Sequence, residues 1–165
     1  MTDGASSPEE PLAEEDVRSY PRPPALEPVP QRVRVRLGGK LIVSTDAALR
    51  VLETHHAPTY YIPFAAIDAE MVPAGGGSIC EWKGRARYWT LRAGGASAER
   101  CGWDYPSPTP RFAALKGHMA LYPAAMEACS VGGLPVSPQP GGFYGGWVTE
   151  NLRGTVKGAR GTEWW

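Results

Sequence analysis

Residues 32–43 read Arg-Val-Arg-Val-Arg-Leu-Gly-Gly-Lys-Leu-Ile-Val. Apolar residues alternate with arginine before the glycines, and this period of two is typical of a strand with one buried face. Gly38-Gly39 then supplies the positive φ angles that a tight hairpin turn needs. The stretch therefore predicts a β-hairpin in which Ile42 faces Val35. Because residues 40–43 are apolar on both faces, we expect the second strand to lie inside its sheet.

The 165-residue chain has the composition of a globular domain, with 42% hydrophobic and 21% charged residues. Lysine plus arginine and aspartate plus glutamate both number 17, so a nucleic-acid-binding role driven by overall charge is not expected. No apolar run approaches the roughly 18 residues of a membrane span, and the N-terminus lacks the apolar region of a signal peptide. We therefore expect no membrane contact and a cytoplasmic location.

Residues 1–30 differ from the rest of the chain. They hold seven acids against two arginines, a net charge of −5, together with seven prolines and few large apolar residues. Such a segment predicts a disordered or extended acidic arm that stays in solvent, because exposed charges attract each other only weakly. We expect a β domain over 31–135, and a glycine- and aromatic-rich extension over 136–165 that packs on it.

Short helices are expected at two places. Pro63–Ala66 suits a helical turn, and Pro110–Lys116 suits a single helix that begins near Thr109 and ends at Gly117. Residues 47–53 are either a short helix or a strand, because periodicity does not decide over so short a run. The other apolar runs indicate strands at 59–62, 70–72, 101–105, 118–122 and 126–131. The chain is therefore predicted to be mainly β with antiparallel strands.

Residues 80–92 form the longest patterned stretch, and we interpret them as one strand that follows a flexible loop at 75–77. On one face of this strand, Gly84 and Ala86 would lie between the large rings of Trp82 and Tyr88. The missing bulk predicts a hollow, and pockets for small ligands are typically lined by aromatic residues with few polar groups. The aromatic residues expected to line this pocket are Tyr61, Trp82, Tyr88, Trp103, Tyr105 and Tyr122.

Cys80 and Lys83 stand at the start of this stretch. A cation lowers the pKa of a nearby thiol and favours the nucleophilic thiolate, so Cys80 is a candidate nucleophile or polar anchor. The alternative is a buried cysteine that packs as a small hydrophobe. A bulge at Gly84 would turn Lys83 toward Cys80. His118 or Asp104 would then be the assisting group of a cysteine enzyme.

The three cysteines, at 80, 101 and 129, are odd in number, widely spaced and without a CxxC motif. We expect reduced thiols, with neither a disulfide framework nor a zinc site. The adjacent histidines His55-His56 are a poor pair of metal ligands because they point in different directions. The sequence also lacks phosphate-loop, dinucleotide-binding and hydrolase motifs, so no metal and no cofactor is expected.

Five short motifs occur in a fixed order along the chain: the Val-Arg-Val-Arg hairpin, Thr59-Tyr60-Tyr61-Ile62-Pro63, Cys80 with Lys83-Gly84 and Ala86-x-Tyr88, Trp103-x-Tyr105-Pro106-x-Pro108, and Ala120-Leu121-Tyr122-Pro123. Through these motifs, residues 33–131 resemble domain-of-unknown-function family 427, which is widespread in bacteria. The resemblance implies a compact antiparallel β-tent-like fold, in which two sheets meet at an angle, with one or two short helices. Zinc-bearing relatives of that fold use paired CxxC motifs, which are missing here, so the metal is not carried over. The nucleotidyltransferase-like label of the family is not carried over either, because no paired acids follow Gly77-Ser78. The tail 141–165 is similar to an extension of some actinobacterial members.

Three functions stay open from the sequence. The first is a module that binds a small planar or amide-bearing molecule between the aromatic residues near Cys80. The second is an enzyme with Cys80 as nucleophile, tuned by Lys83. The third is an interaction domain that uses the tail. The sequence identifies neither the ligand nor a reaction, and it leaves the oligomeric state open.

Overall fold

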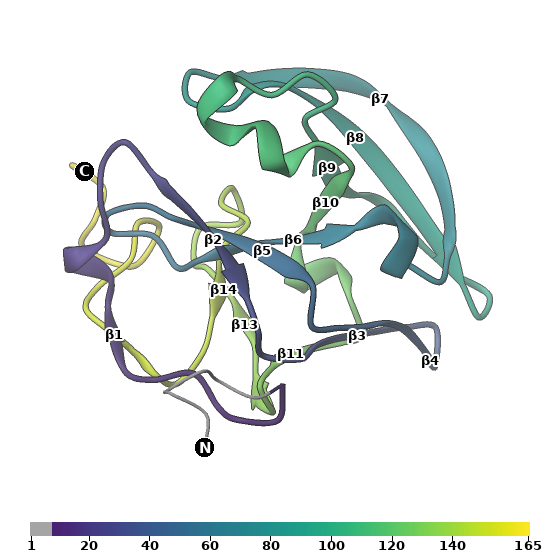
Figure 1. Cartoon of the computed structure of the whole chain (residues 1–165), viewed down its shortest axis with the longest axis horizontal. Coiled ribbons are helices and arrows are strands. Elements are labelled where there is room, and N and C mark those ends of the chain that lie inside the picture. Colours follow the sequence, from purple (N-terminus) through teal and green to yellow (C-terminus); the bar gives the residue numbers. More distant parts are fainter. Residues whose placement is uncertain (1–7) are drawn as a thin grey trace.

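The structure is a computed structural model, describes residues 8–165 and consists mainly of β-strands (Figure 1). Its largest element is a seven-stranded sheet in which every neighbouring pair runs antiparallel. The prediction of a mainly β, antiparallel fold is therefore confirmed. In sheet order the seven strands are β2 (Ala25–Val29), β5 (Ala48–Leu52), β6 (Thr59–Pro63), β10 (His118–Leu121), β9 (Ala96–Asp104), β8 (Gly84–Ala93) and β7 (Glu70–Cys80).

A four-stranded antiparallel sheet packs against the first, in the order β12 (Leu134–Pro135), β11 (Ala128–Val131), β3 (Val33–Leu37) and β4 (Lys40–Thr45). Two short ladders complete the fold: β1 (Glu15–Asp16) runs parallel to β15 (Leu152–Arg153), and β13 (Ser137–Pro138) pairs with β14 (Trp147–Val148). Within residues 8–165 the helices are all short 3-10 turns: η1 (Val17–Ser19), η2 (Phe64–Ala66), η3 (Pro110–Leu115) and η4 (Pro123–Ala125). None of them has the length and apolar character needed to cross a bilayer.

The predicted hairpin is present, but its second strand is not interior. Gly38 and Gly39 adopt φ angles of 61° and 77° in the turn between β3 and β4. Val35 pairs with Val43 instead of Ile42, because the register shifts by one residue next to the turn. A bulge of this kind lets two consecutive side chains, Ile42 and Val43, both point into the core. β4 therefore buries apolar residues from an edge position.

Residues 8–30, the N-terminal segment, do not form the solvated arm that their composition predicts. Residues 1–7 of the predicted arm lie outside the described part of the chain. β2 pairs with β5 over five residues, and Val17 and Val29 are buried. The acids of this segment meet bases of the body, including Glu9 beside Arg34 at 3.5 Å. Backbone pairing adds to these charge contacts and holds the segment on the body. Residues 47–53, for which the sequence left helix and strand open, contain the strand Ala48–Leu52. The helix expected over Pro110–Lys116 is a 3-10 helix over Pro110–Leu115.

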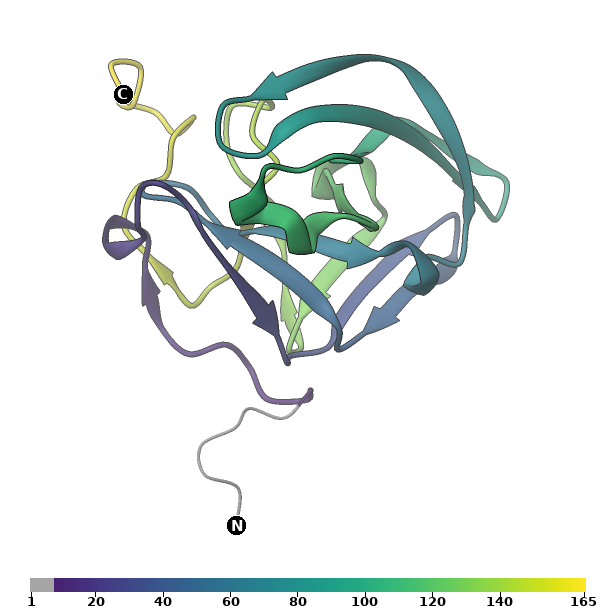
Figure 2. The same ribbon diagram turned by 45° about the horizontal axis from the view of Figure 1, so that its top comes forward.

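The seven-stranded sheet buries both of its faces, because successive residues of a strand point to opposite sides. In β6, Tyr60 and Ile62 enter the core shared with the four-stranded sheet, whereas Tyr61 enters a second cluster on the other face. β10 divides in the same way, with Ala120 in the second cluster. The outer strands β7 and β8 arch over this second face and η3 lies beneath them (Figure 2). This curvature creates the space in which the candidate site lies.

Candidate functional site

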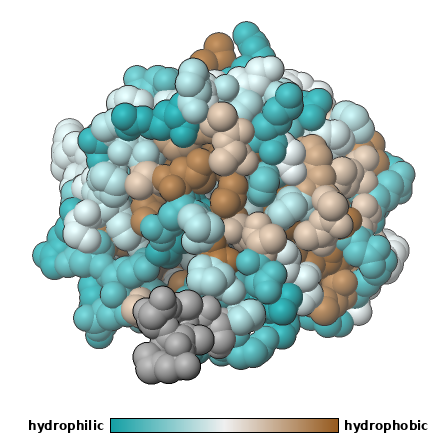
Figure 3. Space-filling view, in the orientation of Figure 1, coloured by the Kyte–Doolittle hydropathy of each residue, from teal (hydrophilic) through white to brown (hydrophobic). Residues whose placement is uncertain are grey.

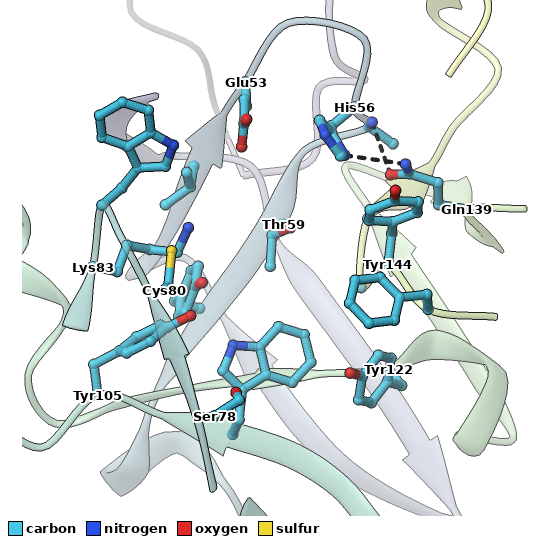
Figure 4. A pocket seen from close by; sticks show the side chains of 18 of the residues that line it. Glu53, His56, Thr59, Ser78, Cys80, Lys83, Tyr105, Tyr122, Gln139 and Tyr144 are labelled. Carbon is cyan, nitrogen blue, oxygen red and sulfur yellow. Dashed lines mark hydrogen bonds between the residues drawn. The ribbon is translucent and has the colours of Figure 1, made fainter. Parts of the chain in front are cut away.

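A cavity of about 490 Å³ opens on the second face of the seven-stranded sheet (Figure 4). Its floor includes Val51 of β5 and Thr59 of β6, and the tip of the β7–β8 hairpin forms one side. In the orientation of Figure 3, hydrophobic residues are visible near the centre and on the right of the molecular face, with hydrophilic residues between and around them. The eight residues that the sequence proposes for ligand binding all line this one cavity: Tyr61, Cys80, Trp82, Lys83, Tyr88, Trp103, Tyr105 and Tyr122.

The local structure that brings Cys80 and Lys83 together differs from the prediction. Residues 80–92 are not one strand: Cys80 ends β7, Gly84 begins β8, and these two residues pair across a three-residue turn. Gly84 has a φ of 113°, which a residue with a side chain rarely adopts. Residues 75–77, expected to form a loop, belong to β7, where the register shifts between Ala74 and Gly77. Lys83 therefore reaches the cavity from a hairpin tip and needs no bulge.

The expected hollow at Gly84 and Ala86 is also placed differently. A Cβ on Gly84 would lie 3.2 Å from the carbonyl oxygen of Ser107, so backbone fills the space beside this glycine. Thr109 ties that segment to the hairpin tip, with its Oγ1 donating to the carbonyl of Trp82 at 2.6 Å. Ala86 is buried in the second cluster. Neither small residue lines the cavity, whose lining includes residues of β6, the β7–β8 hairpin and the tail.

Aromatic rings form the walls in two packed pairs. The rings of Trp103 and Tyr122 lie 4.6 Å apart between centroids, and those of Tyr61 and Tyr105 lie 6.4 Å apart. Burial raises the pKa of all three tyrosine hydroxyls above its usual value, so these groups stay neutral. Tyr88 donates to Ser78 Oγ at 2.9 Å. The walls therefore combine flat apolar faces with neutral polar groups.

The ammonium group of Lys83 lies over two aromatic rings at the hairpin tip. Its Nζ is 6.0 Å from the ring centroid of Tyr105 and 5.8 Å from that of Phe112. Cations are attracted to ring faces at such distances. In the described part of the chain Lys83 forms no ion pair, so its charge remains available to a molecule in the cavity.

The two residues suggested as helpers of Cys80 lie elsewhere. Asp104 is buried beneath the sheet surface, where it accepts hydrogen bonds from Arg87 and from the indole of Trp89, both at 2.8 Å. His118 stands at the start of β10, with its Nδ1 3.1 Å from the carbonyl of Lys116. Neither lines the cavity. Sequence spacing gave no information about these positions, because both depend on the pairing of distant strands.

Cys80 differs from the two other thiols. It is partly exposed at the cavity wall, whereas Cys101 and Cys129 are buried in the main core. Burial raises the pKa of Cys101 to about 11 and that of Cys129 to about 12. These two buried thiols therefore remain protonated near neutral pH.

The sequence interpretation missed the opposite side of the cavity. His56, in the loop between β5 and β6, lines it together with Gln139, Tyr144 and Lys157 of the tail. Figure 4 places His56, Gln139 and Tyr144 across the cavity from Cys80 and Lys83. The rings of His56 and Tyr144 meet edge to face, 4.9 Å apart. Burial, followed by the charge of Lys157, lowers the pKa of His56 to about 4.

The tail is closely fitted against the cavity wall. Gly145 lies so near Trp103 that a methyl group on this glycine would overlap the indole ring. Backbone hydrogen bonds hold the tail in place: Trp147 donates to the carbonyl of Pro58 at 2.8 Å, and Lys157 to that of His55 at 2.8 Å. The expected extension over 136–165 thus contributes a wall of the cavity. Two exposed apolar side chains line its rim, Ile79 and Phe143.

Metal-ligating groups are not gathered in the part of the chain that the structure describes. Within residues 8–165, no group of three or more His, Cys, Asp or Glu side chains is arranged so that it could hold a metal ion. His55 and His56 diverge, because His55 packs on Trp165 with ring centroids 4.5 Å apart whereas His56 faces the cavity.

Comparison with known proteins identifies the family of the chain. Curated proteins include no significant match. A family model described as "Domain of unknown function (DUF427)" matches residues 25–132. The match covers well over half of the chain, and it includes β2 to β11 while the tail beyond residue 132 lies outside it. The chain therefore belongs to the DUF427 family.

Proposed function

We propose that this protein binds a small, mostly planar molecule in the aromatic cavity beside Cys80. The observation that carries the proposal is that eight residues from several separate stretches of the chain line one cavity of about 490 Å³. Binding sites for small molecules occupy roughly 300–1,000 Å³ and combine aromatic walls with a few polar groups. A flat ligand suits this space because ring faces line it on more than one side.

A fragment screen tests the proposal. Aromatic fragments are added to the isotope-labelled full chain at millimolar concentration, and the backbone amide signals that move are mapped on the structure. We expect the shifts to gather on β6, on the β7–β8 hairpin tip and on residues 139–146. The proposal fails if no fragment shifts this set, or if the shifts lie elsewhere.

Substitution of one wall residue makes the test quantitative. Trp82→Ala removes a ring from the hairpin tip, and a stacked aromatic pair contributes about 0.5–1.5 kcal/mol, so affinity should fall about 2- to 12-fold. Trp164→Ala is the matched control, because Trp164 is fully exposed on the tail and does not line the cavity. Equal affinities of the two variants would argue against a site at the hairpin tip.

A cysteine-dependent enzyme is the second candidate. In its favour, Cys80 is the only one of the three thiols that lines the cavity. Against it, the proposed helpers His118 and Asp104 make their contacts outside the cavity. An activated nucleophile would react with iodoacetamide well below pH 8.5, which is about the pKa of an unperturbed thiol. Alkylation of Cys80 only above that pH would remove the enzyme candidate and leave the binding proposal intact.

A further inference from the structure

The side chain of Gln139 contacts three different groups at the edge of the cavity. It is only 2% exposed and lies outside the residues that define the family match. Its Oε1 accepts from the backbone N–H of Ala57 at 3.1 Å, and its Nε2 donates to the carbonyl of Lys157 at 3.0 Å. The same Nε2 lies 3.2 Å from Nδ1 of His56.

These contacts determine which way the amide of Gln139 points. A backbone N–H is only a donor and a backbone carbonyl is only an acceptor. Exchanging the oxygen and nitrogen of the amide would place donor against donor at Ala57 and acceptor against acceptor at Lys157. The nitrogen of Gln139 must therefore face His56.

The amide orientation in turn determines the tautomer of His56. The NH₂ group of Gln139 has only hydrogens to offer, so the Nδ1 of His56 must accept with its lone pair. A neutral imidazole with a bare Nδ1 carries its single proton on Nε2. An imidazolium ion would direct a second N–H at the NH₂ group, so the same contact opposes charging of the ring. Burial and the nearby cations Lys157, Arg22 and Lys83 act in the same direction.

No residue in the described part of the chain accepts the Nε2 proton of His56. Among residues 8–165, Nε2 of His56 forms no hydrogen bond, and the ring lines the cavity. His56 thus offers a neutral N–H donor on the side opposite Cys80, and the ammonium group of Lys83 is a second donor on the near side (Figure 4). A ligand that satisfies both must carry hydrogen-bond acceptors.

We propose that Gln139 holds His56 as an Nε2–H donor and thereby makes the cavity selective for planar molecules that carry a carbonyl or carboxylate acceptor. This inference rests on the proposed function and specifies the ligand class of the same site. It assigns the selectivity to the tail, because the family-matched part of the chain supplies His56 while the tail supplies Gln139 and the carbonyl of Lys157. It also means that His56 cannot remove a proton from Cys80 through Nε2.

The first test measures the tautomer without any ligand. Long-range ¹H–¹⁵N spectra distinguish a protonated from a bare imidazole nitrogen, and we expect His56 to show a protonated Nε2 and a bare Nδ1 at neutral pH. In Gln139→Glu the carboxylate offers only acceptors, so Nδ1 of His56 should become protonated. A protonated Nδ1 in the native protein, or an unchanged tautomer in Gln139→Glu, would overturn the proposal.

The second test measures selectivity with three probes of one ring size: benzamide, benzoate and benzylammonium. We expect the two acceptor-bearing probes to bind more tightly than benzylammonium. His56→Phe keeps a ring but removes the donor, and the lost hydrogen bond should weaken benzamide about 2- to 12-fold. His118→Phe is the matched control, because His118 lies outside the cavity, and it should leave benzamide affinity unchanged.

The two proposals fail in different ways. If none of the probes, and no fragment of the wider screen, shifts cavity residues, the proposed function is wrong whatever the tautomer. If benzamide binds the cavity but His56→Phe and His118→Phe bind it equally, the binding proposal stands and the role of His56 is wrong. Tighter binding of benzylammonium than of benzamide would also overturn the acceptor selectivity.

Discussion

Arg50 should be the charged residue on which attachment of the N-terminal segment depends. Its side chain is 8% exposed and lies between two carboxylates of that segment. The guanidinium donates to Glu15 at 2.6 and 3.0 Å and to Glu27 at 2.8 Å. The hydroxyl of Tyr20 also donates to Glu15. Arg50→Met keeps most of the side-chain volume and removes the charge, so it isolates the electrostatic contribution.

The magnitude follows from the burial of the three groups. Removing one partner of a buried ion pair costs about 3–5 kcal/mol, because the remaining charge is left without compensation. Glu27 is 43% exposed and Glu15 21% exposed, and the part of each carboxylate in water reduces the cost. We therefore expect about 3 kcal/mol, which for a chain of this length lowers the melting temperature by roughly 6–12 °C.

Urea denaturation of the full chain measures this loss, and amide exchange in β2 reports whether the segment detaches. Arg153→Met is the matched control: Arg153 pairs with Glu14 at 2.7 Å, but both side chains are 64% exposed, so about 0–1 kcal/mol is expected. Adding Glu15→Gln to Arg50→Met removes an uncompensated charge and should restore about 1 kcal/mol or more. The reasoning is refuted if Arg50→Met costs no more than Arg153→Met.

Three other outcomes are expected. Gly145→Ala should cost about 1–3 kcal/mol because the new methyl group overlaps Trp103, whereas Gly75→Ala, with open space around its Cβ position, should change stability by less than about 0.5 kcal/mol; equal urea midpoints would contradict this. Folding lowers the pKa of His56 from its ordinary value of 6.5 to about 4, so the unfolded chain binds the proton more readily than the folded chain. Stability should therefore fall as pH drops from about 6.5 toward 4, and His56→Phe should lose less over that window; identical losses would show that another group is responsible. Native alkylation followed by mass spectrometry should modify Cys80 well before the two buried thiols, and equal labelling would mean that the core opens.

Residue patterns predicted part of the candidate site. Aromatic residues, a cysteine and a lysine near one another suggested a pocket, and all eight proposed residues do line one cavity. The suggested cause was wrong, because backbone of Ser107 occupies the space beside Gly84. The pattern marks residues that avoid solvent, but it does not say which distant segment covers them. His56 and Gln139 carried no sequence signal, since their contact joins positions 83 residues apart.

The prediction of a solvated N-terminal arm was wrong for a related reason. Its acidic, proline-rich composition is typical of disorder, yet β2 forms five residue pairs with β5. Composition describes what a segment can bury by itself. It does not include the edge of a sheet that the rest of the chain provides, nor an arginine placed to receive two of its acids.

Strands, turns and the overall β class follow from local rules, because alternation of side chains and the φ freedom of glycine act within a few residues. The hairpin at Gly38-Gly39 is of this kind. The bulge beside Ile42, the edge position of β4 and the curvature that opens the cavity depend on how strands far apart in the chain pair and pack. Those contacts depend on the free energy of the whole folded chain, because the contribution of each residue depends on the distant residues that it contacts.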